Sequence, residues 1–450
     1  MTQRIGIILA AGKGTRMKSD LPKVMHPVAG KPMLDWSIDL ARSVGCDRII
    51  VVCSPEQALL HTHVDHILGP GHVAIQSTPL GTGDAVKAAA SQAGDGAGTS
   101  VVLYGDTPLI QPQSINALIE TVESGKSVGV LGFEAAEPGA YGRLIQDADG
   151  DLIRIVEARD ATSEEIAVTL CNSGVMAAKT ATLFDLLGKI TNENAKGEYY
   201  LTDIIGLAVG AGGRCGVVMC EETDVQGVNS RSELAAANSA FQIRRRQELM
   251  ADGVTLDAPE TVFLSHDTAI GQDAHIEANV VFGPGVRVAG GAKVRAFSHI
   301  EGASIAAGAV VGPFARIRPG TVVGEDCRVG NFVEVKNVQM GEGSKINHLS
   351  YAGDGSIGAS ANIGAGTIFC NYNGFEKHKT QVGAGAFVGS NSALLAPVTI
   401  GDGAYIGSGS VITKDVPADA LAVARGRQIE RKNWAKGYRA SMRSGKTASD

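Results

Sequence analysis

A glycine-containing loop near the start of the chain combines backbone amides with basic side chains. Residues 9–17 read LAAGKGTRM and follow the apolar run IGIIL. Amide N–H groups in such a loop, placed after a strand, bind anions. Pro22 fixes a turn from which Lys23 reaches the same anion. We therefore predict a phosphate site. It is neither a Walker A loop, because Gly14 follows Lys13, nor a dinucleotide fingerprint, because Met17 stands where the third glycine belongs.

A second candidate for chemistry lies in the C-terminal half. His348 stands in the string NHLSY, inside a six-residue repeat that otherwise requires small or apolar side chains. An imidazole titrates near neutral pH and suits general-base catalysis. Taken alone, a histidine at this position fits a surface residue better than a catalytic base. A polar stretch, residues 371–379, interrupts the same repeat further on, and insertions in repeat proteins often carry the binding face.

The first 228 or so residues alternate strand-like and helix-like segments. The apolar runs at 5–9, 48–52 and 101–104 predict buried strands. Between the first two, residues 32–44 begin with proline, have helical apolar spacing and end before Gly45, which predicts a helix. This β-α-β order indicates a mostly parallel sheet covered by helices, with ligands beyond the carboxyl ends of its strands.

The remainder predicts one connecting helix followed by a coil of short strands. Residues 231–250 contain neither Gly nor Pro, and Ser230 with Glu233 has the spacing of a capping box. A period of six then predicts about eight coils of a parallel β-helix over 270–417, with the 371–379 stretch looping out. The predicted inward residues are Ile270, Ile276, Phe282, Val288, Val294, Ile300, Ile305, Val311, Ile317, Val323, Val329, Val335, Met340, Ile346, Ala352, Ile357, Ile363, Val382, Val388, Leu394, Ile400, Ile406 and Ile412.

Composition excludes several classes of protein. Glycine makes up 58 of 450 residues, 44% of residues are hydrophobic and 19% are charged, which disfavours disorder, collagen and a membrane span. The net charge of −7 includes a basic tail, so a nucleic-acid surface is not indicated. Seven cysteines without a CxxC pair, and the absence of a signal-peptide pattern, predict a cytoplasmic protein without disulfides or zinc. His61, His63 and His66 are expected on an exposed helix face.

The extended string LAAGKGTRMKSDLPK, residues 9–23, resembles the signature of sugar-nucleotide pyrophosphorylases. From residue 5 to about 427 the chain resembles the bacterial bifunctional N-acetylglucosamine-1-phosphate uridyltransferases and glucosamine-1-phosphate N-acetyltransferases. The resemblance implies an α/β, Rossmann-like nucleotidyltransferase domain joined by a helix to a left-handed parallel β-helix of hexapeptide repeats. The implied boundaries are 1–229 for the uridyltransferase, 230–250 for the linker helix, 251–425 for the acetyltransferase and 426–450 for a basic, solvated tail.

The resemblance also implies how the first domain works. A phosphate oxygen of N-acetylglucosamine 1-phosphate attacks the α-phosphorus of UTP, with Lys23 and Arg16 as catalytic residues and Mg²⁺ held by Asp106 and Asn229. Taken alone, Asp106 fits a turn cap as well as a metal ligand. The implied residues for UTP and UDP-N-acetylglucosamine are Leu9, Ala10, Ala11, Gly12 and Lys23 at the phosphates, Gln76, Gly81 and Thr82 at the uracil, Asp106 and Asn229 at the cation, Tyr104 and Gly105 just before Asp106, and Gly142, Glu157 and Asn172 at the sugar.

For the second domain, the resemblance implies that His348 takes a proton from the amine of glucosamine 1-phosphate as the amine attacks acetyl-CoA. It further implies a homotrimer assembled through the β-helix, with acetyl sites shared between chains. The implied residues are Arg318, Lys336, Tyr351 and Asn362 for the amino-sugar phosphate, and Ala365, Asn371, Tyr372, Ser390, Ser408 and Arg425 for acetyl-CoA.

Two other functions compete with the bifunctional enzyme. A pyrophosphorylase whose coil serves only oligomerisation predicts no CoA chemistry. A non-catalytic scaffold that senses nucleotide sugars predicts ligand binding without release of pyrophosphate. Against both stands the joint presence of Lys23, Asp106 and Asn229 in one half of the chain and of His348 and Tyr351 in the other. The bifunctional enzyme would supply UDP-N-acetylglucosamine for peptidoglycan and lipopolysaccharide synthesis.

Overall fold

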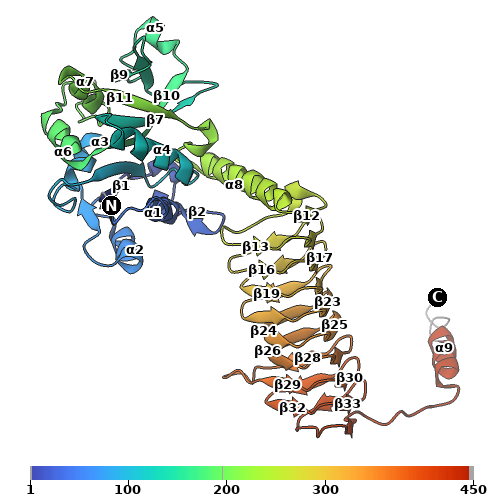
Figure 1. The fold of residues 1–450 in the computed structure, drawn as a ribbon. Coiled ribbons are helices and arrows are strands. Elements are labelled where there is room, and N and C mark those ends of the chain that lie inside the picture. Colours follow the sequence, from blue (N-terminus) through green and yellow to red (C-terminus); the bar gives the residue numbers. More distant parts are fainter. Residues whose placement is uncertain (1–2, 195, 445–450) are drawn as a thin grey trace. The chain divides into compact units, whose positions relative to one another are not determined.

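A computed structural model of the chain describes residues 3–194 and 196–444. Contacts divide the chain into two units, Met1–Glu248 with Leu264–His266 and Leu249–Phe263 with Asp267–Asp450 (Figure 1). The first unit is an α/β domain and the second is a coil of short parallel strands. Each is described by itself below.

The first unit is built on a nine-stranded sheet in the order β5-β4-β1-β6-β10-β7-β11-β9-β8. The predicted strands are confirmed as β1, β4 and β6, which pair in parallel. The prediction of a mostly parallel sheet also holds for β7 and β11, which pair in parallel, but the sheet beyond β6 is mixed. There β10 enters antiparallel to both β6 and β7, and β8 and β9 form an antiparallel pair with a short connection. The strands are β1 (Arg4–Leu9), β4 (Arg48–Cys53), β5 (Val73–Ile75), β6 (Thr99–Tyr104), β7 (Val128–Glu134), β8 (Arg143–Gln146), β9 (Leu152–Val156), β10 (Leu170–Lys179) and β11 (Cys215–Met219), with a separate pair β2 (Pro27–Val28) and β3 (Lys31–Pro32).

Helices cover both faces of this sheet. Apolar side chains of α1, α2 and α4 pack with one set of alternating strand residues, and those of α3, α6 and α7 pack with the other set. The helix predicted over 32–44 is confirmed as α1. The helices are α1 (Met33–Ser43), α2 (Ala58–Leu68), α3 (Thr82–Ala88), α4 (Pro112–Glu123), α5 (Ser163–Ile166), α6 (Thr180–Lys189), α7 (Asp203–Gly210) and α8 (Arg231–Ala251), with 3-10 turns η1 (Thr15–Met17), η2 (Lys23–Met25), η3 (Glu222–Asp224) and η4 (Pro259–Thr261).

The second unit is a parallel β-helix whose strands stack as rungs (Figure 1). All the predicted inward residues are buried, which confirms the period of six. The strands are β12 (Thr255–Leu256), β13 (Ala269–Ile270), β14 (His275–Ile276), β15 (Val281–Phe282), β16 (Arg287–Val288), β17 (Lys293–Val294), β18 (His299–Ile300), β19 (Ala303–Ile305), β20 (Val310–Val311), β21 (Arg316–Arg318), β22 (Thr321–Val323), β23 (Arg328–Asn331), β24 (Glu334–Met340), β25 (Lys345–His348), β26 (Tyr351–Ile357), β27 (Asn362–Ile363), β28 (Ile368–Cys370), β29 (Thr380–Val382), β30 (Phe387–Val388), β31 (Ala393–Leu395), β32 (Val398–Ile400), β33 (Tyr405–Ile406), β34 (Val411–Ile412) and β35 (Leu421–Ala422).

The polar stretch predicted to leave the coil lies between β28 and β29. Residues 372–377 are exposed, and the Phe375 side chain is 93% accessible. An isolated bridge between Tyr372 and Lys377 closes the excursion. The prediction of a loop is therefore confirmed.

The basic tail contains one further helix, α9 (Trp434–Ser444). Its described side chains are exposed, in agreement with solvated basic residues. In the described part of the chain, none of the helices has the length and apolarity needed to span a bilayer.

Candidate functional sites

The phosphate loop and Lys23 face one cavity of about 580 Å³ in the first unit. The loop leaves β1 and turns at Gly14, whose φ is +60°. A methyl group at Gly14 would lie 2.6 Å from Cβ of Lys23, so the glycine allows the loop to contact the lysine. The lining residues are Leu9, Ala10, Ala11, Gly12, Lys13, Lys23, Val24, Gln76, Pro79, Gly81, Thr82, Ala85, Tyr104, Asp106 and Glu198.

Lys23 joins the two predicted cation ligands. Its ammonium group donates to the carboxylate of Asp106 and, over 3.0 Å, to Oδ1 of Asn229. Asp106 follows β6, and Asn229 precedes α8. The Val228 amide donates to the carbonyl of Asp106 over 2.9 Å, which fixes one segment beside the other. One carboxylate and one amide oxygen thus converge on a positive charge, a donor set that suits a hard divalent cation.

The cap of α8 also holds Asn229. Ser230 Oγ accepts from the Glu233 amide over 3.3 Å, as the predicted capping box requires. The Glu233 carboxylate accepts over 2.6 Å from the backbone amide of Asn229 rather than from that of Ser230. The first turn of the helix therefore positions the backbone of a predicted ligand.

The residues predicted at the uracil share one corner of the cavity. Nε2 of the buried Gln76 donates to the Gly81 carbonyl over 3.1 Å and to Asp84 over 2.8 Å. Gly81 has a φ of +111°, and a methyl group there would lie 2.6 Å from the carbonyl oxygen of Tyr199. Thr82 Oγ1 accepts from the Leu201 amide. These contacts order the corner through the chain segment around Tyr199, which sequence patterns did not identify.

The residues predicted at the sugar lie together but do not line this cavity. The Asn172 amide donates to the Gly142 carbonyl over 2.8 Å, and a methyl group at Gly142 would lie 3.7 Å from a carboxylate oxygen of Glu157. Burial raises the pKa of Glu157, and Asp160 and Asp203 raise it further, while Lys196 opposes them. The pKa of Tyr104 is also raised, by burial and by the charges of Asp106 and Glu157.

The residues that line the cavity differ in three respects from those expected from the sequence. Lys13 and Glu198 line the cavity although the sequence did not identify them as ligands. A methyl group at Gly81 would lie 3.0 Å from Cβ of Glu198. Arg16 lies in the exposed turn η1 and is not among the cavity-lining residues of the described chain. Gly105, between Tyr104 and Asp106, packs under the site near Val24.

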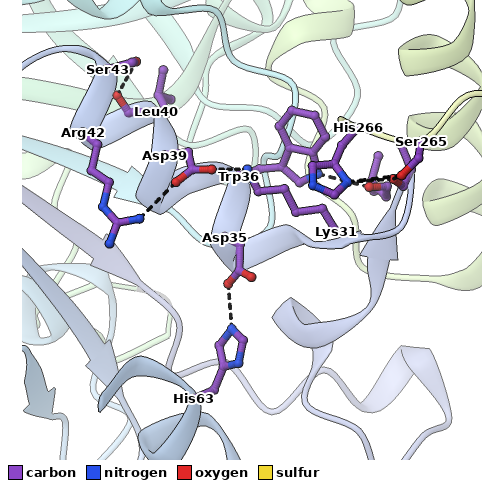
Figure 2. Close-up of polar contacts among 12 residues, drawn as sticks. Lys31, Asp35, Trp36, Asp39, Leu40, Arg42, Ser43, His63, Ser265 and His266 are labelled. Carbon is purple, nitrogen blue, oxygen red and sulfur yellow. Dashed lines mark hydrogen bonds and ion pairs between the residues drawn. The ribbon is translucent and has the colours of Figure 1, made fainter. Parts of the chain in front are cut away.

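The expectation of an exposed histidine face on α2 is wrong for His63. Nε2 of His63 lies 2.7 Å from Oδ1 of Asp35 on α1, and the imidazole is mostly buried (Figure 2). His61 is also partly buried, with Nε2 2.9 Å from the Ser54 carbonyl. The packing of α2 near α1 turns these side chains inward.

His348 ends β25 in the second unit and pairs in register with Asn331 on β23. Its Nδ1 donates to Oδ1 of Asn331 over 2.7 Å. Because an amide oxygen only accepts, this contact places the proton on Nδ1 and leaves the lone pair on Nε2. His348 is exposed, so Nε2 is free to act as a base. Sequence reasoning missed Asn331, because its role depends on the stacking of two coils.

Cations gather on a second sheet of the coil, where β21 pairs with β24. Strand pairing sets Arg318 next to Lys336, and Arg318 donates to Glu334 over 2.8 Å. Contact with Lys377, then burial and the charge of Arg318, lower the pKa of Lys336, while Asp354 raises it. Lys377 belongs to the loop that leaves the coil. The cluster can bind a substrate phosphate.

A row of predicted acetyl-CoA contacts runs along one corner of the coil. The Gly366 amide donates to the His348 carbonyl, and the next rungs continue through hydrogen bonds from Asn391 to Ala365 and from Gly409 to Ser390. Ser408 and Arg425 lie on the following rungs next to Gly389 and Gly409.

Two residues predicted at the amino-sugar phosphate lie on nearby strands. Asn362 pairs with Lys345 on the adjacent strand. The hydroxyl of Tyr351 lies 3.5 Å from Nδ2 of Asn371, a predicted acetyl-CoA contact, and Tyr372 begins the exposed loop.

Both units match known protein families. Residues 6–168 match the MobA-like NTP transferase domain, and residues 302–337 and 379–414 match the bacterial transferase hexapeptide of six repeats. Relatives named bifunctional protein GlmU occur in Hyphomonas neptunium (61% identity, 99% of this chain and 97% of the relative), Sphingopyxis alaskensis (50%, 98% and 98%) and Caulobacter vibrioides (53%, 97% and 95%).

The raised pKa of Glu157 predicts a pH-dependent gain in stability on Glu157→Gln. A carboxyl group with a raised folded-state pKa favours folding below its unfolded-state pKa, and this contribution is lost as pH rises through the folded-state value. Removing the charge should therefore stabilise the protein more at pH 7 than at pH 4. Thermal unfolding at both pH values measures the difference, with the exposed Glu120→Gln as control. Equal shifts for the two variants at both pH values would refute the assignment.

Proposed function

This chain belongs to the GlmU family of bifunctional proteins, and we propose that it acetylates glucosamine 1-phosphate with acetyl-CoA and then transfers UMP from UTP to the product. The chain is an enzyme with a nucleotidyltransferase domain and a hexapeptide acyltransferase domain, the latter a left-handed β-helix. The products of the second reaction are UDP-N-acetylglucosamine and pyrophosphate. We assign uridylyl transfer to residues 1–229 and acetyl transfer to 251–425, with 230–250 as linker and 426–450 as tail.

One observation carries this proposal. Each unit has its own complete set of reactive groups: Lys23 shared by Asp106 and Asn229 in the first, and His348 oriented by Asn331 in the second. A coil that served only as an oligomerisation scaffold would require neither an oriented base nor a cluster of cations. The pairing of His348 with Asn331 therefore favours the bifunctional enzyme over a monofunctional pyrophosphorylase.

In uridylyl transfer, a phosphate oxygen of N-acetylglucosamine 1-phosphate attacks the α-phosphorus in line with the bond to the leaving pyrophosphate. This oxygen is already an anion at neutral pH, so no protein base is needed. Lys23 and the loop amides offset the negative charge of the reacting phosphates, and the cavity aligns them. Arg16, which does not line the cavity, would add positive charge from the turn that follows the loop. Asp106 and Asn229 would hold Mg²⁺, which supplies further positive charge when it is bound.

In acetyl transfer, the amine of glucosamine 1-phosphate attacks the thioester carbonyl of acetyl-CoA. Nε2 of His348 takes the proton that the amine loses, the C–S bond breaks and CoA leaves as its thiol after protonation. Arg318 and Lys336 bind the sugar phosphate, and the rung contacts at Ala365, Ser390 and neighbouring residues bind CoA. Backbone amides there stabilise the tetrahedral oxyanion.

The first test separates the two activities. Purified protein given glucosamine 1-phosphate and acetyl-CoA, without UTP, should release free CoA thiol. His348→Ala should lower this rate about a hundredfold or more and leave UMP transfer unchanged, because it removes only the base. Lys23→Ala should do the reverse. The control is His299→Ala, an exposed coil histidine outside the site. Full acetylation by His348→Ala would refute the assignment.

The second test concerns the cation. Chelation of divalent metal should abolish UMP transfer and spare CoA release, because the proposed cation ligands Asp106 and Asn229 belong to the uridylyl-transfer site. Asp106→Asn should raise the Mg²⁺ concentration for half-maximal UMP transfer by about tenfold or more. Asp20→Asn, an exposed acid after the phosphate loop, is the matched control. An unchanged Mg²⁺ dependence in Asp106→Asn would remove this residue from the cation site.

We further propose that the protein is a cytoplasmic homotrimer assembled through the coil. An exposed ladder of Phe297, Phe314 and Phe332, with ring centroids 4.9 and 5.2 Å apart, continues to Leu349 beside His348. Association of copies would cover this apolar surface. Sedimentation equilibrium should give three times the chain mass of 46.4 kDa, and Phe314→Ser should reduce it. A monomeric wild-type protein would refute the trimer.

A further inference from the structure

A buried carboxylate lies under the cations of the acetyl-transfer site. Asp354, in β26, is 8% exposed and has a backbone φ of +54°. Its Oδ1 accepts from Nδ2 of Asn337 over 2.9 Å, and its Oδ2 accepts from Nδ2 of Asn371 over 2.6 Å. A buried charge is unfavourable unless it is paired and hydrogen-bonded. Asp354 is therefore held in one orientation by two side-chain amides.

The surroundings favour the ionised form of this acid. Burial raises the pKa of Asp354, but the hydrogen bonds from Asn337 and Asn371 and the charges of Lys336 and Lys377 together hold it below its ordinary value. The charge of Asp354 in turn raises the pKa of Lys336 and so favours its charged form, whereas the contact with Lys377 lowers this pKa. The acid thus balances two ammonium groups that would otherwise repel each other.

Asp354 also fixes the base of the loop that leaves the coil. Asn371 is the first residue of that loop, and its carbonyl accepts from the His378 amide over 2.8 Å. Tyr372 and Lys377 pair just above this closure. Since Nδ2 of Asn371 points at Asp354, the amide oxygen of Asn371 is directed to the other side. The carboxylate therefore determines which end of this amide the loop presents.

We propose that Asp354 is a positioning residue of the acetyl-transfer site. It orients the Asn371 amide for acetyl-CoA and holds Lys336 and Lys377 together for the sugar phosphate, so it links the two substrate sites. The inference rests on the proposed function, in which Asn371 contacts acetyl-CoA. If its role were purely structural, Asp354 would only join neighbouring rungs by hydrogen bonds and would not influence substrate affinity.

The test is Asp354→Asn, which keeps the shape and removes the charge. Its new NH₂ group would face the NH₂ group of either Asn337 or Asn371, so one of the amides must turn over. We expect KM for acetyl-CoA to rise about tenfold, with a smaller change in kcat, and the affinity for CoA in calorimetry to fall in parallel. UMP transfer by the same chain should be unchanged, which verifies that the first unit is intact, and an unchanged unfolding temperature should verify the folding of the coil. Asp326→Asn is the matched control, an exposed coil aspartate with a φ of +53°.

A double-mutant cycle separates positioning from simple stabilisation. If Asp354 acts through Asn371, Asp354→Asn should have little further effect on this KM in an Asn371→Ala background. Fully additive effects, or a lower unfolding temperature with wild-type KM, would overturn the inference. A wild-type protein that neither binds nor consumes acetyl-CoA would overturn the proposed acetyl transfer itself. Normal wild-type turnover with an unaffected Asp354→Asn variant would overturn only the role of Asp354.

Discussion

Parallel strands paired in register are the constraint on which both sites depend. In the sheet, β1 and β6 run side by side, so the phosphate loop and Asp106 follow strands that end at one edge. In the coil, pairing of successive rungs sets Lys336 beside Arg318 and His348 beside Asn331. Residues far apart in the sequence therefore meet through the backbone ladder. Their spacing follows from strand geometry rather than from flexible loops.

Both sites use the same electrostatic arrangement. Each gathers charge of one sign around a partner of the opposite sign, and a side-chain amide completes the set: Lys23 lies between Asp106 and Asn229, and Asp354 lies between amides beneath two lysines. Amides fix the orientation of a charged group without cancelling its charge. Groups held in this way need little rearrangement when a phosphate arrives, which is the condition for strong electrostatic stabilisation of a reaction.

Sequence periodicity predicted the coil well because every inward position of a rung requires a small or apolar residue, and this requirement is visible in the sequence. The fully buried Ile317 is an example. The resemblance to a family supplied residues of the first unit, among them Lys23, Gln76 and Asp106, that line one cavity. The antiparallel entry of β10 and the inward turn of His63 were not predictable, because both depend on the packing of segments distant in the sequence. The sequence did not identify Asn331 and Asp354 as site residues, for a related reason. They occupy ordinary repeat positions, and only the neighbouring rungs give them partners.

In the β-helix, the number of residues between paired strands does not determine the height of the stack. Gly355 pairs with Thr380, twenty-five residues on, whereas Thr380 pairs with Val398, eighteen residues on, and the rungs stack in parallel in both cases. The additional residues leave through the 371–379 loop and add nothing to the height of the stack. The exposed part of this loop can therefore change in length without changing the height of the coil, provided that Asn371 keeps its contact with Asp354.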